Sequence, residues 1–174
     1  MWTGEIQSHF TVEGSDVNAT TLCLDKTDLI CVKVNSSLIG EGRLKIRIRF
    51  PYPTGGWKDA GINWRNEQKH SSGIAVTRQF GASLFHQIDT TMYYADCHWT
   101  GRAEISKWKE HEYIISSKTQ SSFSFFCLFT PEKPQASTFD NTATLFVFEN
   151  VQKNYRETWK HFWESGGAID FSGS

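Results

Sequence analysis

The chain has 174 residues, about the length of one ordinary domain, and 39% of them are hydrophobic, which is normal for a folded globular protein. Its 18 Lys and Arg balance 19 Asp and Glu to a net charge of −1, so it lacks the basic excess typical of nucleic-acid-binding proteins. No apolar run approaches the roughly 20 residues that span a bilayer, and the N-terminus lacks the regions of a signal peptide. We therefore expect a soluble protein with no nucleic-acid and no membrane partner, in a compartment that the sequence leaves open.

Alternation of apolar and polar residues dominates the first three quarters of the chain and predicts short β-strands. These strands are Glu5–Thr11, Thr20–Leu24, Leu29–Val34, Arg43–Phe50, Ile74–Phe80, Ser83–Asp89, Met92–Trp99, Arg102–Trp108, Tyr113–Ser117 and Ser122–Phe129. Two connections, Asp25–Asp28 and Thr100-Gly101, have the residues of hairpin turns. Nine or ten strands at this spacing favour a sandwich or a barrel over a parallel α/β sheet. The fold class that we expect is mainly β, an antiparallel, supersandwich-like β-sandwich over residues 1–135.

The strand predicted at Arg43–Phe50 has the clearest pattern. Apolar and basic residues occupy opposite faces, with Leu44, Ile46, Ile48 and Phe50 on one and Arg43, Lys45, Arg47 and Arg49 on the other. The pattern predicts a half-buried antiparallel strand. Its basic face is either a solvated surface beside acidic neighbours or a site for an anion or a partner.

A loop rich in Pro, Gly and Trp follows this strand, over Pro51–Trp64. Prolines and glycines restrict a loop to a defined shape. We expect the loop to bind a carbohydrate substrate through Trp57, Asp59, Asn63 and Trp64. An indole can stack on a sugar ring, and the carboxylate and amide can bind its hydroxyl groups. The alternative is that the tryptophans only cap the core of the sandwich.

Cysteine and histidine show no spacing that indicates a metal site. The four cysteines lie in strand-like runs and are interpreted as small hydrophobes, although Cys23 and Cys31 could form a disulfide across a hairpin. His111, between Glu110 and Glu112, is interpreted as part of a solvated charge run. The chain also lacks the GxSxG, P-loop, GxGxxG and HExxH motifs. We therefore predict no metal, no cofactor and no catalytic residue.

After Pro134 the apolar residues recur at steps of three and four, which predicts an amphipathic helix. The helix is expected to begin near Asp140 or Thr142 and to end at Gly166-Gly167. One face carries Leu145, Phe148, Gln152, Tyr155, Trp159, Phe162 and Trp163. Such a stripe needs a large partner surface, either this sandwich or a further domain.

The end of this helix and the loop after the basic strand resemble segments of the six-hairpin glycosidase-like proteins. Trp159, Phe162-Trp163 and Gly166-Gly167, followed by Ile169–Gly173, match their pattern W-x-x-F-W-x-x-G-G and I/V-D-F/L-S-G. In that group this pattern leads from an N-terminal β-sandwich into a catalytic α/α toroid domain. The loop from Pro51 to Asp59 resembles the P-Y-P-T-G loop of the same group.

The resemblance implies that residues 136–174 are a linker helix and the start of a following toroid domain, which in that group carries the general acid and base. We therefore expect an inactive N-terminal domain of a glycoside hydrolase that shapes the cleft of the toroid. Interdomain packing is expected through Trp159, Phe162 and Trp163. The alternatives are a free-standing carbohydrate-binding module and a structural or partner-binding sandwich.

Overall fold

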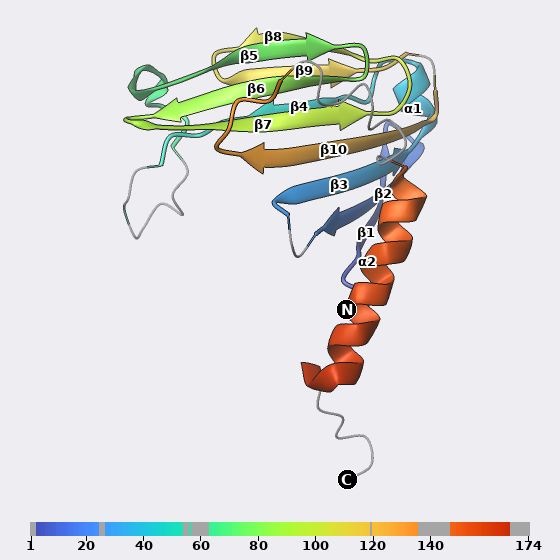
Figure 1. The fold of residues 1–174 in the computed structure, drawn as a ribbon. Coiled ribbons are helices and arrows are strands. Elements are labelled where there is room, and N and C mark those ends of the chain that lie inside the picture. Colours follow the sequence, from blue (N-terminus) through green and yellow to red (C-terminus); the bar gives the residue numbers. More distant parts are fainter. Residues whose placement is uncertain are drawn as a thin grey trace.

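The computed structural model describes residues 3–24, 27–53, 56, 63–118, 120–135 and 147–167, which form two antiparallel sheets and a long C-terminal helix (Figure 1). In chain order the elements are β1 (Ile6–Val12), β2 (Ser15–Cys23), β3 (Leu29–Asn35), α1 (Ser37–Gly40), β4 (Ile46–Arg49), η1 (Glu67–Lys69), β5 (His70–Arg78), β6 (Gly81–Ile88), β7 (Thr91–Trp99), β8 (Glu104–Lys109), β9 (Glu112–Ser116), β10 (Ser122–Thr130) and α2 (Phe148–Phe162). The large sheet has the strand order β1-β2-β3-β10-β7-β6-β5, and the small sheet has the order β4-β9-β8. The predicted fold class is confirmed.

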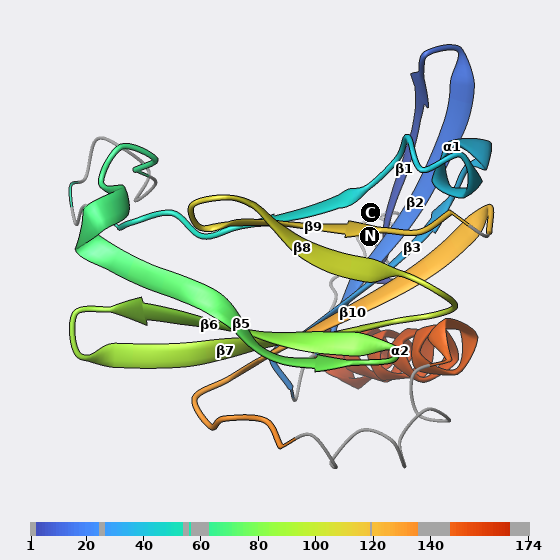
Figure 2. The same cartoon turned by 90° about the horizontal axis from the view of Figure 1, so that it is seen from above.

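The two sheets are layers of unequal width. Figure 2 shows the small sheet on one side of the large sheet and α2 on the other. The small sheet lies over β5, β6, β7 and β10, whereas β1, β2 and β3 twist away from that layer and rise beside it. The inner face of β1 to β3 is therefore not covered by a strand of the small sheet.

The main core fills the space between the two layers. It is formed by the inward-facing residues Ala82, Leu84, Ala95, Cys97, Trp99, Phe123, Phe125 and Cys127 of the large sheet, with Phe50, Tyr113 and Ile115 opposite them. Period-two alternation places these side chains on one face of each strand. The apolar face predicted for residues 43–50 packs here, although the strand itself is shorter, Ile46–Arg49.

A second core lies between the large sheet and α2. Leu22, Cys31 and Phe126 of the sheet pack against Phe148 and Tyr155 of the helix. At the edges of this contact Glu149 pairs with Lys33, and Arg156 pairs with Glu5. The helix therefore uses one part of the predicted stripe to cover the outer face of β2, β3 and β10.

The ends of α2 agree with the sequence in part. Gly166 has a φ of 104°, a conformation that ends helices and favours glycine. The predicted start near Asp140 or Thr142 and the predicted stripe residue Leu145 lie outside the described residues. In the part of the chain that the structure covers, no helix has the length and apolarity needed to cross a membrane.

One of the two predicted hairpin turns needs correction. Thr100-Gly101 does form a turn, with φ of 71° at Gly101, but it carries the chain from the large sheet into the small one and does not close a hairpin. The β1–β2 hairpin, in contrast, turns at Glu13-Gly14, where φ is 51° and 79°. Positive φ at both central residues is the geometry of a two-residue type I′ turn.

The cysteines are all free, as the interpretation as small hydrophobes requires. The alternative Cys23–Cys31 disulfide is wrong, because Cys31 pairs with Leu22 across the hairpin and Cys23 pairs with Ile30. Adjacent residues of a strand point to opposite faces. Cys31 is accordingly buried and Cys23 is exposed.

Candidate functional site

The candidate site lies at the end of the sandwich where β4, the segment before β5 and the β8–β9 turn meet. A backbone bridge joins Tyr52 to Asn63, with both N–H groups donating to the opposite carbonyl at 3.0 Å. This bridge closes the base of the predicted loop and places Asn63 and Trp64 beside the end of β4. Trp57 and Asp59, the other two predicted substrate-binding residues, lie outside the described residues.

Trp64 lies on the surface of the molecule. The residue is 39% exposed. The guanidinium of Arg49 covers one face of its ring, 3.5 Å from the ring centroid. Stacking of this kind holds an indole in one orientation at low cost. Asn63 accepts a hydrogen bond from the backbone N–H of Arg65 through Oδ1, at 2.8 Å, and so fixes the turn that presents the tryptophan.

Arg49 also connects Trp64 to a buried carboxylate. Its guanidinium forms an ion pair with Glu112, with Nε 2.7 Å from Oε1. The other carboxylate oxygen, Oε2, is buried and has no hydrogen-bond partner, and the guanidinium of Arg47 is 3.9 Å away. An unsatisfied buried acceptor costs about 1–3 kcal/mol. Glu112, itself only 7% exposed, is therefore ready to accept a hydrogen bond from a donor that enters the site.

These side chains border a pocket of about 10 Å³, the Trp64 pocket, lined by Arg49, Phe50, Asn63, Trp64, Glu67, His70, Glu110, His111 and Glu112. Its volume is below the roughly 300–1,000 Å³ of complete small-molecule sites. The pocket therefore suits one polar group of a ligand, with the rest of the ligand outside, against Trp64.

Three histidines form the inner wall of this end of the sandwich. Nδ1 of His70 lies 2.7 Å from Nε2 of His86, and the rings of His70 and His111 stack with centroids 3.7 Å apart. Nδ1 of His86 is hydrogen-bonded to the Tyr93 hydroxyl at 2.8 Å, and Nδ1 of His111 to the Ser72 hydroxyl at 2.9 Å. The histidines thus belong to one network that joins the pocket to the core.

Two of these histidines, His86 and His70, are disfavoured as cations. Burial, assisted by the neighbouring His70 and His111, lowers the pKa of His86 from 6.5 to about 4. Burial and His111 also lower the pKa of His70, against the opposing effect of Glu67 and Glu110. Within the described ranges no group of three or more His, Cys, Asp or Glu has a geometry that could hold a metal ion.

The interpretation of His111 as part of a solvated charge run is wrong, because His111 is 3% exposed. It adopts a φ of 56° in the β8–β9 turn, and its Nε2 is 2.8 Å from the carbonyl oxygen of Glu67. Glu112 is buried because it pairs with Arg49 in the β4–β9 register, beneath the arginine side chains of β4. Local sequence gives no signal for this pairing, since it depends on which strands become neighbours.

The predicted interdomain residues form an aromatic cluster at the C-terminal end of α2. The ring centroids of Phe162 and Trp163 are 4.9 Å apart, and both rings lie within 5.6 Å of Trp159. Trp159 is half-buried against the second core, whereas Phe162 is 49% exposed. Figure 1 shows this end of the helix beyond the edge of the large sheet, and the described lining of the Trp64 pocket contains no residue of α2. The two predicted sets of site residues are therefore not brought together.

Comparison with known proteins supplies the fold but no family. No family model matches the chain, and no curated protein matches its sequence. Among solved structures, a protein from the human microbiome assigned as a kojibiose phosphorylase has a similar fold, with a TM-score of 0.54 and 9% sequence identity. The match covers 93% of this chain but 24% of that protein, so the fold found here is one part of a longer polypeptide there.

Proposed function

We propose that this chain is a non-catalytic β-sandwich domain of a carbohydrate-active enzyme, and that residues 136–174 lead into a following α/α toroid domain. The observation that carries the proposal is the structural match to a protein assigned as a kojibiose phosphorylase, in which the shared fold occupies 24% of the chain. In this arrangement residues 1–135 are the sandwich domain, and catalysis belongs to the toroid.

The aromatic cluster of α2 supports a role in domain packing. Trp159 is held by the sandwich, while Phe162, 49% exposed, extends the same apolar surface outwards. Clustered aromatic residues on a surface are typical of interfaces, where they supply much of the contact energy. We propose that Trp159, Phe162 and Trp163 pack against the toroid.

The coding sequence beyond Ser174 tests the domain proposal directly. We expect it to continue in frame through a domain made of paired helices. A stop codon directly after Ser174, or continuation into a region with the period of β-strands, would overturn the proposal.

A carbohydrate-binding module is the second candidate, and the Trp64 pocket is the observation that favours it. The exposed indole offers an apolar face for a sugar ring, and the buried Oε2 of Glu112 offers an acceptor for one hydroxyl group. The same pocket would form part of the rim of a catalytic cleft if a toroid follows. The two candidates therefore share a sugar contact and differ in whether the chain acts alone.

Titration of the chain with gluco-oligosaccharides, monitored by tryptophan fluorescence, tests the sugar contact. Trp64→Ala should abolish binding, whereas Trp108→Ala, a change at another exposed tryptophan, on β8, should leave it unchanged. Glu112→Gln should weaken sugar binding and leave the chain folded. Equal losses in the Trp64 and Trp108 variants would refute the site. Hydrolysis or phosphorolysis by the isolated chain that disappears in the Glu112 variant would refute the non-catalytic role.

A further inference from the structure

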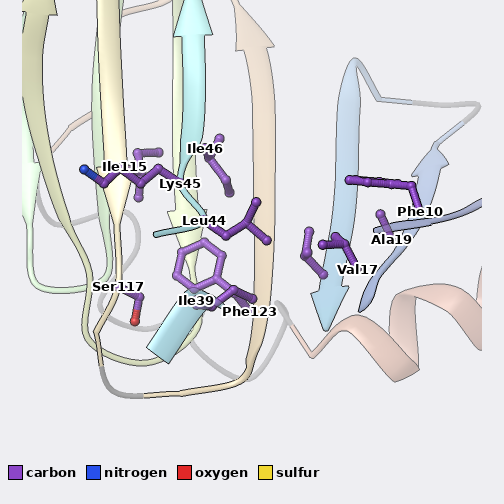
Figure 3. Close-up of a pocket in the computed structure, with 11 residues that line it drawn as sticks. Phe10, Val17, Ala19, Ile39, Leu44, Lys45, Ile46, Ile115, Ser117 and Phe123 are labelled. Atoms are coloured by element: carbon purple, nitrogen blue, oxygen red, sulfur yellow. The ribbon is translucent and has the colours of Figure 1, made fainter. Parts of the chain in front are cut away.

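A second surface, independent of the proposed function, lies where the two layers of the sandwich part. An apolar groove of about 140 Å³, open to solvent, runs between β4 and the inner face of β1, β2 and β3. Figure 3 shows Phe10, Val17 and Ala19 on one side of it and Leu44, Ile46 and Ile39 on the other. Phe10 is 46% exposed, so apolar surface is left in contact with water. Exposed apolar surface in a concave site is characteristic of binding surfaces.

The groove adjoins a free strand edge. In the part of the chain that the structure describes, β4 is an edge strand of the small sheet. One of its edges pairs with β9, and the opposite edge faces the groove. Phe50 donates to the carbonyl of His111, and the same register pairs Ile48 with Tyr113. Hydrogen-bonded pairs alternate along an antiparallel ladder. The N–H and C=O groups of Arg47 and Arg49 therefore point away from β9, toward the open side of the strand.

The polar groups around the groove are basic. Lys45 lines it, and Arg47, with its side chain 53% exposed, follows on the same face of the strand. Arg43 is already paired with Glu13 and Glu41, and Arg49 with Glu112. Within the described residues Lys45 has no ion pair, and the largely exposed Arg47 approaches Glu112 only at 3.9 Å. These two are therefore the cations along this edge that an acidic partner could neutralise.

We propose that β4 accepts an extended partner strand whose side chains alternate between apolar and acidic residues. The partner's backbone would pair with Arg47 and Arg49 in the manner of β-strand addition. Its apolar side chains would enter the groove over Val17, Ala19 and Val34, and its acidic side chains would lie beside Lys45 and Arg47.

Other occupants fit these observations less well. A sugar would find few polar groups, since Ser117, the polar uncharged residue of the lining, already donates its hydroxyl to the carbonyl of Arg102. A second copy paired through its own β4 would place lysine and arginine opposite lysine and arginine, and like charges across a ladder are destabilising. Charge complementarity therefore favours a partner strand with acidic side chains over a second copy of β4.

Three fluorescent peptides test the proposal by anisotropy with the intact chain. One alternates Val and Glu over eight residues, one alternates Val and Lys, and one repeats the Val and Glu sequence with alternate backbone nitrogens methylated. We expect the first to bind with an affinity that falls as salt is added, and the other two to bind at least about tenfold more weakly. Equal binding of the Val–Lys peptide, or of the methylated peptide, would overturn the proposal.

Amide hydrogen exchange locates the contact. The Val–Glu peptide should slow exchange at Arg47 and Arg49, and protection confined to β1 or β5 would refute the assignment of the edge. Lys45→Glu should weaken binding about tenfold, while Lys153→Glu on the exposed side of α2 should not. Protection of the same amides by raising the protein concentration without peptide would show that a second copy occupies the groove, and would also overturn the proposal.

Discussion

Acid should destabilise this fold through His86. The residue is 1% exposed, and its ring stacks on Phe50 with centroids 4.7 Å apart. Its two nitrogens are hydrogen-bonded to His70 and Tyr93. Its pKa is lowered from 6.5 to about 4 by burial and by the two neighbouring histidines, so the folded protein keeps this side chain neutral in a range where the unfolded chain is protonated.

The magnitude follows from proton linkage. Between pH 6.5 and about 4 the unfolded state binds more protons at this residue than the folded state, so the free energy of unfolding falls as the pH falls. One pH unit of pKa difference corresponds to about 1.4 kcal/mol, which gives a loss of about 3 kcal/mol between pH 7 and pH 4. That is a large share of the roughly 5–15 kcal/mol that stabilises a typical domain. The pKa values of Asp96 and Glu110 are also lowered in the folded protein. Protonation of these carboxylates therefore lowers the free energy of unfolding as well, but only below about pH 4.5.

Urea unfolding at pH 7.5, 6.5, 5.5 and 4.5, followed by tryptophan fluorescence, measures the effect. His86→Phe keeps an aromatic ring beside Phe50 and Tyr93 but cannot bind a proton, so its stability should vary much less over this range. His9→Phe, at a side chain that is 65% exposed, is the matched control and should keep the parent slope. Parallel curves for the parent chain and the His86 variant, or an NMR titration midpoint of His86 near 6.5, would refute the reasoning.

Three further predictions concern packing and charge, and urea unfolding measures each. Gly4→Ala should destabilise the fold more than Gly14→Ala. Both glycines have positive φ, but an added Cβ at Gly4 would overlap the ring of Trp159, whereas Gly14 faces open space. Equal losses of stability in the two variants would contradict the Gly4–Trp159 contact. Trp159→Ala should cost about 2 kcal/mol of stability, because the ring is half-buried and a fully buried tryptophan would cost roughly 3–5 kcal/mol. A loss under about 0.5 kcal/mol, typical of a surface substitution, would show that the ring does not pack on the second core. Asp96→Leu should cost about 3–5 kcal/mol of stability, because it leaves the buried Arg78 without its carboxylate partner. Adding Arg78→Met should recover part of the loss. A double variant less stable than Asp96→Leu alone would contradict the argument that an unpaired buried charge causes the loss.

The strands were accessible from the sequence because alternation at period two reflects a physical requirement, the burial of one face. The residues that form the main core, such as Leu84 and Ile115, follow that alternation. Sheet membership was not accessible in the same way. Thr100-Gly101 has the composition of a hairpin turn, but whether two successive strands pair or enter different layers depends on packing across the whole domain.

The candidate site illustrates the same limit. Asn63 and Trp64 could be selected from the local composition of their loop, and Trp64 does lie at the surface. Arg49 and Glu112 could not, because a carboxylate between His111 and Tyr113 is ordinary until β4 pairs with β9 and brings the two side chains to 2.7 Å. The histidine network likewise joins His70, His86 and His111 from three separate strands or turns, through contacts that no spacing in the sequence encodes.

The backbone bridge between Tyr52 and Asn63 has a consequence for how this site could diversify. Its two hydrogen bonds clamp the ends of the intervening segment, so the strand before it and the tryptophan after it keep their positions whatever the segment contains. Doubling the length of a closed loop costs only about 0.6 kcal/mol of chain entropy. Residues 53–62 can thus be lengthened, shortened or exchanged almost independently of the stability of the sandwich, which makes the clamp a natural point for grafting a new specificity onto an unchanged scaffold.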